Sequence, residues 1–263
     1  MSTLELRDVT KEYRLRGGFR GRTLTAVSHV DFTIESGRTT ALVGQSGSGK
    51  STIAKLLMQL ERPTSGQVLF DGTPVGRHGA ALRSYRSDVQ MVFQDPFASL
   101  NPYHSVRHHL ERPLRLHGKA TTRDDLDTRV TSLLERVRLD PEMADRRPHE
   151  LSGGQRQRIA IARALAPEPK ILVADEPVSM LDVSIRLGVL NLLADLQNEE
   201  DLGVLYITHD LATARHFSDD ILVMYRGEIV ERGPADEVIL NPQHEYTRLL
   251  AEAAPDPEKR IHA

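Results

Sequence analysis

The chain has 263 residues, a length that predicts one large or two small domains with a sizeable hydrophobic core. Hydrophobic residues make up 39% and charged residues 27%, which is typical of globular proteins and excludes a disordered chain. The balance of 34 Lys and Arg against 37 Asp and Glu argues against nucleic acid as a partner, and a chain without cysteine forms no disulfide, thiolate zinc site or iron–sulfur cluster. The longest apolar runs are strand-sized and no cationic stretch leads into an apolar one at the start, so we expect neither a membrane span nor a secretory signal.

The first part of the chain shows the period of β-strands and then that of a helix. Apolar residues alternate with polar ones, or form a short run, at 4–6, 30–34 and 41–43. Residues 14–22 are rich in Gly and Arg and predict a loop. Apolar positions over 53–60 follow helical spacing and predict a helix that begins at Ser51 and ends before Pro63.

The middle of the chain is predicted to be mostly helical. A hairpin is expected at 68–72 and a short strand at 89–93, after which residues 94–118 show no period. Apolar residues over 126–137 recur at helical spacing and predict a helix, with the aspartates at 124–125 as caps.

The last third alternates between helix and strand patterns. The predicted elements are a helix from 155, a strand at 171–174, a helix at 184–196, a strand at 204–208, a short helix, and a strand at 221–225. Strands that alternate with helices predict a mainly parallel α/β sheet.

A glycine-rich run at 44–51 matches the pattern G-x-x-x-x-G-K-[ST]. It lies between a predicted strand and a predicted helix, which is the arrangement that phosphate binding by such a loop requires. Its glycines let successive N–H groups point into one concavity, and the helix N-terminus adds the positive end of a dipole, so phosphate oxygens bind there. Lys50 is predicted to reach the β and γ phosphates of ATP, and Ser51 to bind Mg²⁺. The predicted ATP-binding residues of the run are Gly44, Gln45, Ser46, Gly47, Ser48, Gly49, Lys50, Ser51 and Thr52.

A second acidic element follows the apolar run at 171–174, which ends in Asp175 and Glu176. Asp175 is predicted to hold the metal, and Glu176 to lie near the γ phosphate and polarise an attacking water. Many buried strands end in Asp or Glu, so this run is weak evidence for a metal site by itself. It becomes strong evidence because the phosphate loop occurs in the same chain. Together the two elements predict ATP hydrolysis with Mg²⁺.

A third pattern is the run Leu151-Ser152-Gly153-Gly154-Gln155 before an alanine-rich helix. Two glycines after a serine expose N–H groups at a helix start, although by itself the run is also explained as an N-cap. It resembles the signature of the ATP-binding cassette (ABC) ATPases. The resemblance implies a head-to-tail dimer, in which Ser152, Gly153, Gly154 and Gln155 contact ATP on the partner's phosphate loop.

Other ABC motifs occur in family order over about residues 4–250. Tyr13 resembles the aromatic residue that stacks on adenine, and Gln94 the glutamine of the Q-loop. Residues 179–182, which end in Asp182, resemble the D-loop with methionine in place of its usual alanine, and His209 resembles the switch histidine. Each could singly be an ordinary strand, loop or surface residue, but their joint order favours the family.

The resemblance also implies roles for these residues. The implied catalytic residues are Glu176, His209, Gln94 and Lys50. The implied Mg²⁺ ligands are Ser51, Gln94 and Asp175.

Two further segments narrow the resemblance within the family. Residues 94–102 and 241–247 are similar to the peptide, oligopeptide and nickel importer branch, and the loop at 17–22 resembles that branch's longer N-terminal hairpin. Glu245 stands where the branch usually has proline, and the cysteines that some members carry near the C-terminus are absent.

Two groups of residues invite other functions. His104, His108 and His109 with Glu111 could be drawn as a metal site, but a solvated polar face is favoured. The arginines of 14–22 could contact lipid headgroups or nucleic acid, but a hydrated loop is favoured.

These patterns predict an α/β fold: a P-loop NTPase core of the RecA type with an antiparallel β portion and an inserted helical subdomain at about 95–165. The ATPase domain is expected to cover 4–250, followed by a charged tail at 251–263. The resemblance implies an ATP-hydrolysing subunit that powers an importer and lies peripherally on the cytoplasmic face of the cell membrane. Its implied partners are two permease subunits, a substrate-binding protein, and a second ABC ATPase in a homodimer or heterodimer, with contact to the permeases in 94–118.

Three other functions share part of this pattern. An ABC ATPase that acts on nucleic acid or in translation usually shows two cassettes, a long coiled coil or zinc cysteines, and this sequence shows none of these features. An accessory ATPase of a soluble enzyme complex, such as a phosphonate-degrading one, shares much of the pattern and stays an alternative. A P-loop kinase does not explain residues 151–155. The solute is not readable from this chain, and branch members carry peptides, metals or sugars.

Overall fold

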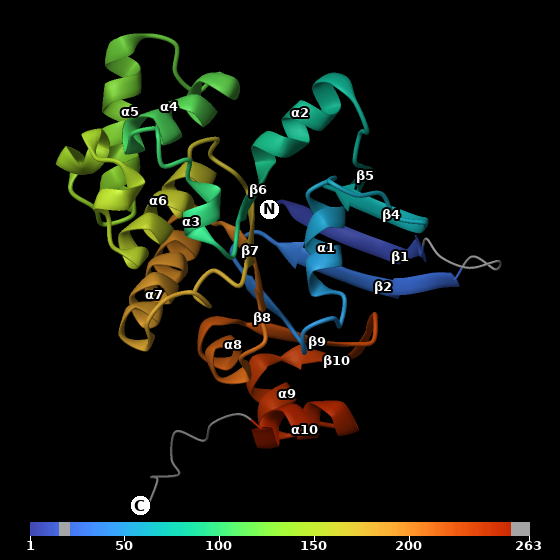
Figure 1. The fold of residues 1–263 in the computed structure, drawn as a ribbon. Helices are drawn as coiled ribbons and strands as arrows, with labels where there is room; N and C mark the ends of the chain where they lie inside the picture. The colour runs from blue at the N-terminus through green and yellow to red at the C-terminus, as the bar shows by residue number, and fades with distance from the viewer. Residues whose placement is uncertain (16–21, 254–263) are drawn as a thin grey trace, which may run out of the picture. The chain divides into compact units, whose positions relative to one another are not determined.

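The computed structural model describes residues 1–15 and 22–253. The predicted loop at 17–22, apart from the backbone of Arg22, and most of the predicted tail at 251–263 lie outside this part of the chain. The described residues form two compact units (Figure 1). The first unit consists of Met1–Leu4, Ile34–Arg38 and Phe70–Leu205, and the second of Glu5–Thr33, Thr39–Leu69 and the chain from Tyr206 onward.

The second unit contains a sheet made from the long strands at the start of the chain. Strand β1 (Thr3–Leu15) lies between β2 (Arg22–Glu35) and β4 (Ser65–Phe70). Val30 and Phe32 of β2 are buried while their neighbours Asp31 and Thr33 are exposed, so one face of the strand packs on the core. The alternation in the sequence predicted these strands correctly.

The parallel strands of the second unit lead to the phosphate loop. Strand β3 (Thr39–Val43) is buried throughout and pairs in parallel with β9 (Asp220–Tyr225), which pairs antiparallel with β10 (Glu228–Pro234). In the order of the sheet, β8 (Gly203–Thr208) is the neighbour of β3 on the other side. The helices of this unit are α1 (Lys50–Leu57), α8 (Leu211–Phe217), α9 (Ala235–Leu240) and α10 (Glu245–Ala253).

Helix α1 is shorter than its sequence predicted. It ends at Leu57 because Gln59 takes a left-handed conformation with φ of 52°, and the N–H groups of Leu60 and Glu61 both turn back to the carbonyl of Lys55. Leu60 is consequently 60% exposed and is not part of the helix's buried face.

The first unit combines short parallel strands with most of the helices. Strand β6 (Val89–Val92) pairs in parallel with β7 (Ile171–Asp175), and β8 is the next strand after β7 in the order of the sheet. The predicted hairpin is confirmed between β4 and β5 (Thr73–Pro74), where Asp71 and Gly72 both have positive φ, as a two-residue hairpin turn requires.

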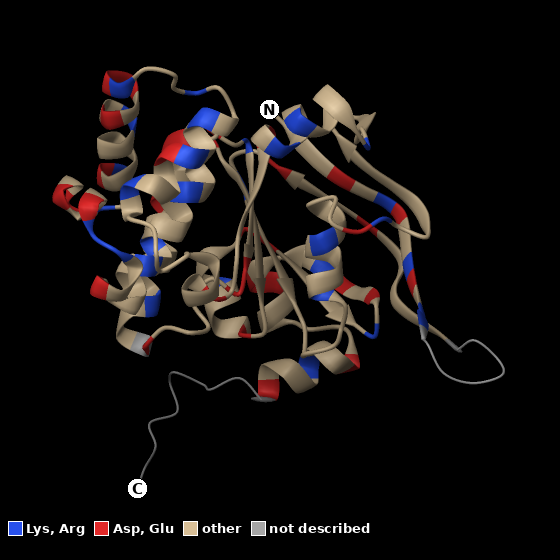
Figure 2. Cartoon of the chain, turned by 45° about the horizontal axis from the view of Figure 1, so that its top comes forward, with Lys and Arg blue, Asp and Glu red and all other residues tan. Residues whose placement is uncertain are grey.

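The helices of the first unit are α2 (Gly79–Asp88), α3 (Pro96–Ser99), α4 (Val106–Leu116), α5 (Arg123–Arg136), α6 (Gly153–Leu165) and α7 (Val183–Glu200), with 3₁₀ turns η1 (Pro141–Asp145) and η2 (Pro148–Glu150). Helices α3 to α6 fall within the predicted helical segment, whose boundaries at about 95 and 165 stay a prediction. Figure 2 shows Lys and Arg interspersed with Asp and Glu over these helices. In the part of the chain that the structure describes, none of the helices combines the length and the apolar character of a membrane span.

Helix α4 lies within the predicted helical segment, although its stretch of sequence shows no apolar period. Its polar positions include two histidines and three arginines, and its interior holds Pro113; only Val106, His109, Leu110 and Leu114 are buried. The caps predicted for the next helix were wrong. Helix α5 is capped by the hydroxyl of Thr122 and not by Asp124 or Asp125. The two aspartates lie in its first turn, where their negative charges stabilise the positive end of the helix dipole.

Candidate functional site

The phosphate loop follows β3 and needs glycine at defined positions. Gly47 and Gly49 have φ of 80° and 116°, values that side chains disfavour. A Cβ atom on Gly49 would lie 2.4 Å from the carbonyl oxygen of Ala26, and one on Gly44 only 2.2 Å from that of Met224. A Cβ on Gly47 would meet nothing within 4 Å. The loop is therefore packed tightly on neighbouring backbone at its two ends, while its middle faces open space.

Lys50 begins α1 and is only 6% exposed. Its Nζ donates to the carbonyl oxygens of Gly44 at 2.6 Å and Gln45 at 3.0 Å, so the ammonium is drawn over the loop. The first N–H groups of a helix lack partners within the helix and carry the positive end of its dipole. The N–H groups of the glycine-rich loop and the ammonium group of Lys50 fit phosphate oxygens. The hydroxyl oxygen of Ser51, in the first turn of α1, fits a hard cation.

Tyr13 of β1 is held at its hydroxyl and covered on its ring. The phenol donates to the carboxylate of Glu61 at 2.5 Å, and the ammonium of Lys11 lies 5.0 Å from the ring centroid and 3.3 Å from Glu61. Burial and the bond to Glu61 raise the pKa of Tyr13, although the hydroxyl of Thr52 opposes this shift. The bond to Tyr13 in turn lowers the pKa of Glu61. A ring fixed in this way can act as a stacking surface for a base. Glu61 was not predicted, because the sequence placed it in the last turn of a longer helix, whereas it lies in the loop after α1.

The acidic element lies in the first unit, at the carboxyl ends of two neighbouring parallel strands. Asp175 is the last residue of β7, and Glu176 follows it in a left-handed conformation with φ of 44°. Gln94 comes two residues after β6, and its amide Nε2 donates to Glu176 Oε2 at 2.9 Å. The structure thus joins two predicted residues that are 82 positions apart in the sequence. Carboxylate and amide oxygens of this kind are the ligands that Mg²⁺ prefers.

The signature run begins α6 and caps it. Ser152 Oγ accepts the N–H of Gln155 at 3.3 Å, and Gln155 Oε1 accepts the N–H of Ser152 at 2.9 Å, which is a capping box. A Cβ on Gly154 would lie 2.6 Å from Ile185 in α7, whereas one on Gly153 would meet only Leu181, at 3.5 Å. Gly154 is therefore required for the packing of α6 on α7, and Gly153 leaves room at the helix start.

The predicted D-loop and switch histidine precede helices. Residues 179–182 form a turn in which Ser179 donates to the carbonyl of Glu176 through both its N–H and its hydroxyl, and Asp182 is the N-cap residue of α7. His209 is exposed in the second unit, between β8 and Asp210, whose carboxylate caps α8.

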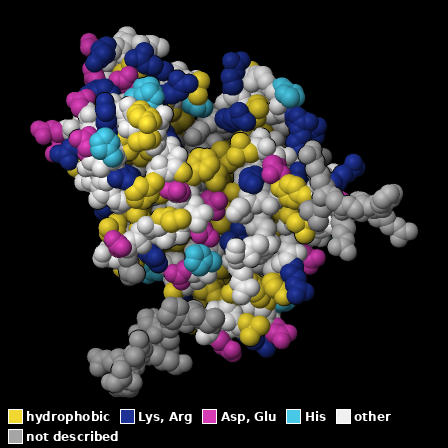
Figure 3. Space-filling view, viewed as in Figure 1, with side chains coloured by type: hydrophobic (Ala, Val, Ile, Leu, Met, Phe, Trp, Pro, Cys, Tyr) yellow, Lys and Arg dark blue, Asp and Glu magenta, His cyan; other side chains and the backbone are white. Residues whose placement is uncertain are grey.

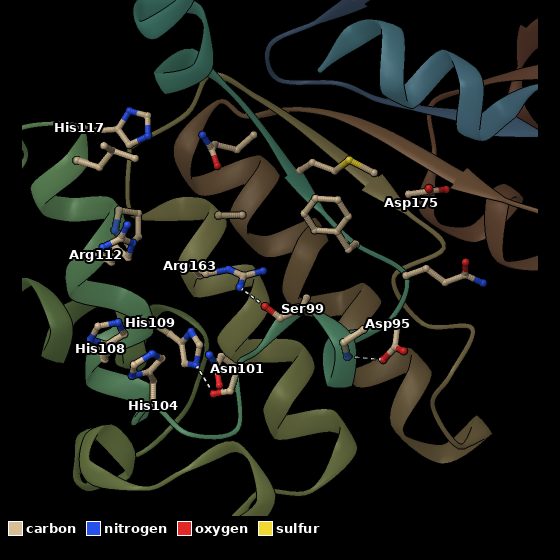
Figure 4. Close-up of a pocket in the computed structure, with 18 residues that line it drawn as sticks. Asp95, Ser99, Asn101, His104, His108, His109, Arg112, His117, Arg163 and Asp175 are labelled. Atoms are coloured by element: carbon tan, nitrogen blue, oxygen red, sulfur yellow. Dashed lines mark hydrogen bonds between the residues drawn. The ribbon is translucent and has the colours of Figure 1, made fainter. Parts of the chain in front are cut away.

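The three histidines around the start of α4 contact one another. The rings of His104 and His108 stack with centroids 4.0 Å apart, and His109 Nε2 lies 3.1 Å from the carbonyl oxygen of Asn101 (Figure 4). Burial lowers the pKa of His109, while Glu111 pairs with Arg115 and not with the histidines. In the described part of the chain, no three His, Asp or Glu side chains are arranged to hold a metal ion.

These histidines line an open groove of about 1190 Å³ in the first unit. Twelve of its 18 lining residues fall within 94–117, and others come from β6, α6 and the end of β7. Figure 4 shows Arg112, Arg163 and the histidines projecting toward it. Histidine and apolar side chains lie next to each other on this face around α4 (Figure 3).

Known proteins are similar to this chain in both sequence and fold. Residues 27–179 match the ABC transporter family. The chain is 47% identical to the di/tripeptide transport ATP-binding protein DppF of Pseudomonas aeruginosa (98% of this chain, 82% of that protein) and 46% identical to the oligopeptide transport ATP-binding protein AppF of Bacillus subtilis (98% and 79%). It is also 47% identical to the glutathione import ATP-binding protein GsiA of Salmonella typhimurium, covering 97% of this chain and 42% of that protein.

Solved structures agree with the sequence relatives. CbiO1 of Clostridium perfringens, part of an ABC transporter complex, has a TM-score of 0.79 at 29% identity, over 90% of each chain. The ATP-binding cassette MJ0796, in a dimeric post-hydrolysis state bound to ADP and Pi, has a TM-score of 0.76 at 31% identity, over 88% of this chain and 98% of that one.

The fold is that of a P-loop NTPase, as the sequence predicted. The chain belongs to the ABC transporter family and is an ATP-binding, ATP-hydrolysing subunit of that family.

Proposed function

We propose that this subunit hydrolyses MgATP to power an importer of peptides or similar small solutes. The observation that carries this proposal is the phosphate loop, in which Lys50 is drawn over a glycine-rich backbone at the start of α1. The names of the relatives, which transport dipeptides, oligopeptides or glutathione, favour peptide-like solutes. Partners of the subunit are then two permeases and a substrate-binding protein, and its place is the cytoplasmic face of the membrane.

The proposal assigns a role to each set of residues. Residues 44–52 bind the triphosphate, and Tyr13 stacks on adenine. Ser51, Gln94 and Asp175 hold Mg²⁺, which supplies charge neutralisation at the phosphates. Glu176 accepts a proton from the attacking water, and its bond to Gln94 supports this role because it fixes the direction in which the carboxylate points. His209 and Asp182 complete the site, and 152–155 act on the partner subunit's ATP.

Lys50→Ala is the direct test of the phosphate loop. Because the ammonium contacts ground-state phosphates, its loss is expected to raise the Kd for MgATP roughly 10- to 100-fold, the size of one charge-assisted hydrogen bond. Equilibrium titration with a fluorescent ATP analogue measures this change. Lys170→Ala, which removes a half-exposed lysine 3.9 Å from Asp88, is the matched control and should bind normally. Unchanged affinity in Lys50→Ala would count against the assigned loop.

The groove of the first unit is the proposed contact for the permeases. Arg163 donates to the carbonyl of Ser99 at 2.5 Å, and burial lowers its pKa. Within residues 1–15 and 22–253, neither Arg163 nor Arg112 forms an ion pair with a carboxylate. The largely buried guanidinium of Arg163 is costly without an acidic partner, so a segment that brings a carboxylate into the groove stabilises it. Arg112 is exposed on the same groove and can pair with the same carboxylate. The apolar side chains of Phe93 and Leu116, which are 44% and 78% exposed, suit the apolar face of such a segment.

Reversing the charge of Arg112 tests this contact. Arg112→Glu places a carboxylate where we expect the partner's own, and should weaken retention of co-expressed permeases roughly tenfold or more. Arg83→Glu changes the same type of residue at an exposed position of α2, outside the groove lining, and serves as control. The readout is co-purification from detergent-solubilised membranes, with ATPase activity of the isolated subunit unchanged in both. Equal retention by the two variants would remove the groove from the permease interface.

A further inference from the structure

The C-terminal run 241–247 has no role in the proposed function, yet it reaches the phosphate loop. The hydroxyl oxygen of Tyr246, in α10, accepts the backbone N–H of Gln45 at 2.9 Å, across 201 positions of sequence. Tyr246 is 7% exposed, so the acceptor of this hydrogen bond is buried, whereas the donor residue Gln45 is exposed. Both residues belong to the second unit.

Gln45 is the residue on which the contacts inside the loop converge. Its carbonyl oxygen accepts the N–H of Ser48 at 3.1 Å and the ammonium of Lys50 at 3.0 Å. With Tyr246 on its N–H, the peptide groups on both sides of Gln45 are fixed. A change at this residue therefore moves the carbonyl that helps to hold Lys50.

Tyr246 is itself held firmly in place. Its ring stacks on Tyr225, the last residue of β9, with centroids 4.1 Å apart and the planes inclined by 27°. Its N–H donates to His244 Nδ1 at 3.1 Å. The ring is thus fixed by β9 and by the start of its own helix, and its hydroxyl has one defined direction.

The carboxylate of Glu231 on β10 anchors the run that carries Tyr246. Its two oxygens accept the N–H of Gln243 at 2.7 Å and that of His244 at 3.0 Å. Burial would raise the pKa of Glu231, but the hydrogen bonds it accepts, led by that from Gln243, outweigh this and keep the pKa below its usual value. The carboxylate form, which accepts both bonds, is therefore the stable one.

We propose that Tyr246 is a positioning residue for the phosphate loop, and that Glu231 and the run 241–247 serve to hold it there. Glycine-rich backbone loses much conformational freedom when a ligand orders it. A hydrogen bond that fixes Gln45 before ATP arrives reduces that loss, so part of the affinity for MgATP depends on the C-terminal helix. This inference rests on the proposed function only for the identity of the ligand.

Tyr246→Phe tests the proposal by removing one oxygen atom and keeping the stacked ring. Two changes are expected: faster hydrogen exchange at the Gln45 amide in the nucleotide-free protein, and a Kd for MgATP raised roughly 3- to 10-fold, the size of one hydrogen bond. Tyr206→Phe is the matched control, because the Tyr206 hydroxyl lies 3.2 Å from Thr213 Oγ1 in the same unit. It should lower thermal stability without changing either quantity.

Glu231→Gln provides a second variant that leaves Tyr246 intact. It replaces one acceptor oxygen with an amide donor opposite a backbone N–H, and should shift exchange at Gln45 and the Kd in the same direction as Tyr246→Phe. Because both changes act through one contact, the double variant should weaken binding less than the product of the two single effects.

The outcomes separate this inference from the proposed function. Wild-type protein that binds no MgATP would overturn the proposed function, while exchange at Gln45 would still report on the contact. Unaltered exchange and affinity in both Tyr246→Phe and Glu231→Gln, or equal changes in Tyr206→Phe, would overturn the role of Tyr246. If Tyr246→Phe does not fold, Glu231→Gln alone decides.

Discussion

Glu176→Gln is expected to bind MgATP as the wild type does and to hydrolyse it roughly 10²- to 10⁴-fold more slowly, because general-base assistance has this size. Glutamine has nearly the same shape and keeps an oxygen that accepts the bond from Gln94, so the site should keep its geometry. What is lost is the negative charge that takes the proton of the attacking water. Single-turnover hydrolysis measures the rate, and equilibrium titration measures the binding.

The control for this variant is Glu135→Gln, an exposed glutamate on α5. It changes the net charge by the same amount and should leave both rate and affinity unaltered. Hydrolysis by Glu176→Gln at near wild-type speed would show that another group takes the proton. A loss of MgATP binding in place of turnover would assign Glu176 to the metal.

A mixture of two inactive variants is expected to recover ATPase activity if the signature works on the partner's ATP. Ser152→Arg blocks the signature, and Lys50→Ala disables the phosphate loop. In a head-to-tail dimer of one variant with the other, one composite site carries both changes and the other carries neither. Activity should then rise with the fraction of mixed dimers, from a baseline at which each variant alone is close to inactive.

The measurement is ATP turnover over a range of mixing ratios, with dimer composition determined by native mass spectrometry. Substantial activity of Ser152→Arg alone would remove the signature from the mechanism. Inactivity of verified mixed dimers would argue that one intact site does not turn over by itself. If the chain pairs only with a different ABC ATPase, the two changes are placed on the two chains of that heterodimer.

The strand, loop and helix at 39–57 were predictable because each of them depends on local sequence. The run 41–43 is apolar throughout, as a strand buried on both faces requires, and the glycines of the loop mark their positions by residue type. The end of α1 was not predictable in the same way. Leu60 continues the apolar spacing, and only the left-handed Gln59 shows that the chain has already turned.

Helix α4 shows a different limit. Its buried positions include His109, a residue that hydrophobic patterns count as polar, so the apolar period is interrupted where the helix in fact packs. A histidine whose ring nitrogen lies against the carbonyl of Asn101 can be buried, but that partner is known only from the fold.

For the site, the sequence predicted which residues to examine but not the contacts among them. The hydrogen bond between Gln94 and Glu176 depends on the parallel pairing of β6 with β7, and the bond between Tyr13 and Glu61 depends on the loop after α1. Tyr246 lay in a run that the resemblance singled out, yet nothing in its residue type indicated a contact with Gln45. The type of each residue can be read from the sequence at one position, whereas its contact partners lie far away in the sequence and are known only from the fold.

The capping box at the start of α6 limits which amino acids can replace Ser152. Ser152 Oγ uses its acceptor side on the N–H of Gln155, so the hydroxyl proton is directed away from its own helix. A serine can therefore cap its helix and donate to an anion at the same time. Aspartate caps helices as well as serine does, but it has no proton to donate and would repel a phosphate. Selection for stability alone would accept either residue, whereas an anion at this helix start requires the hydroxyl.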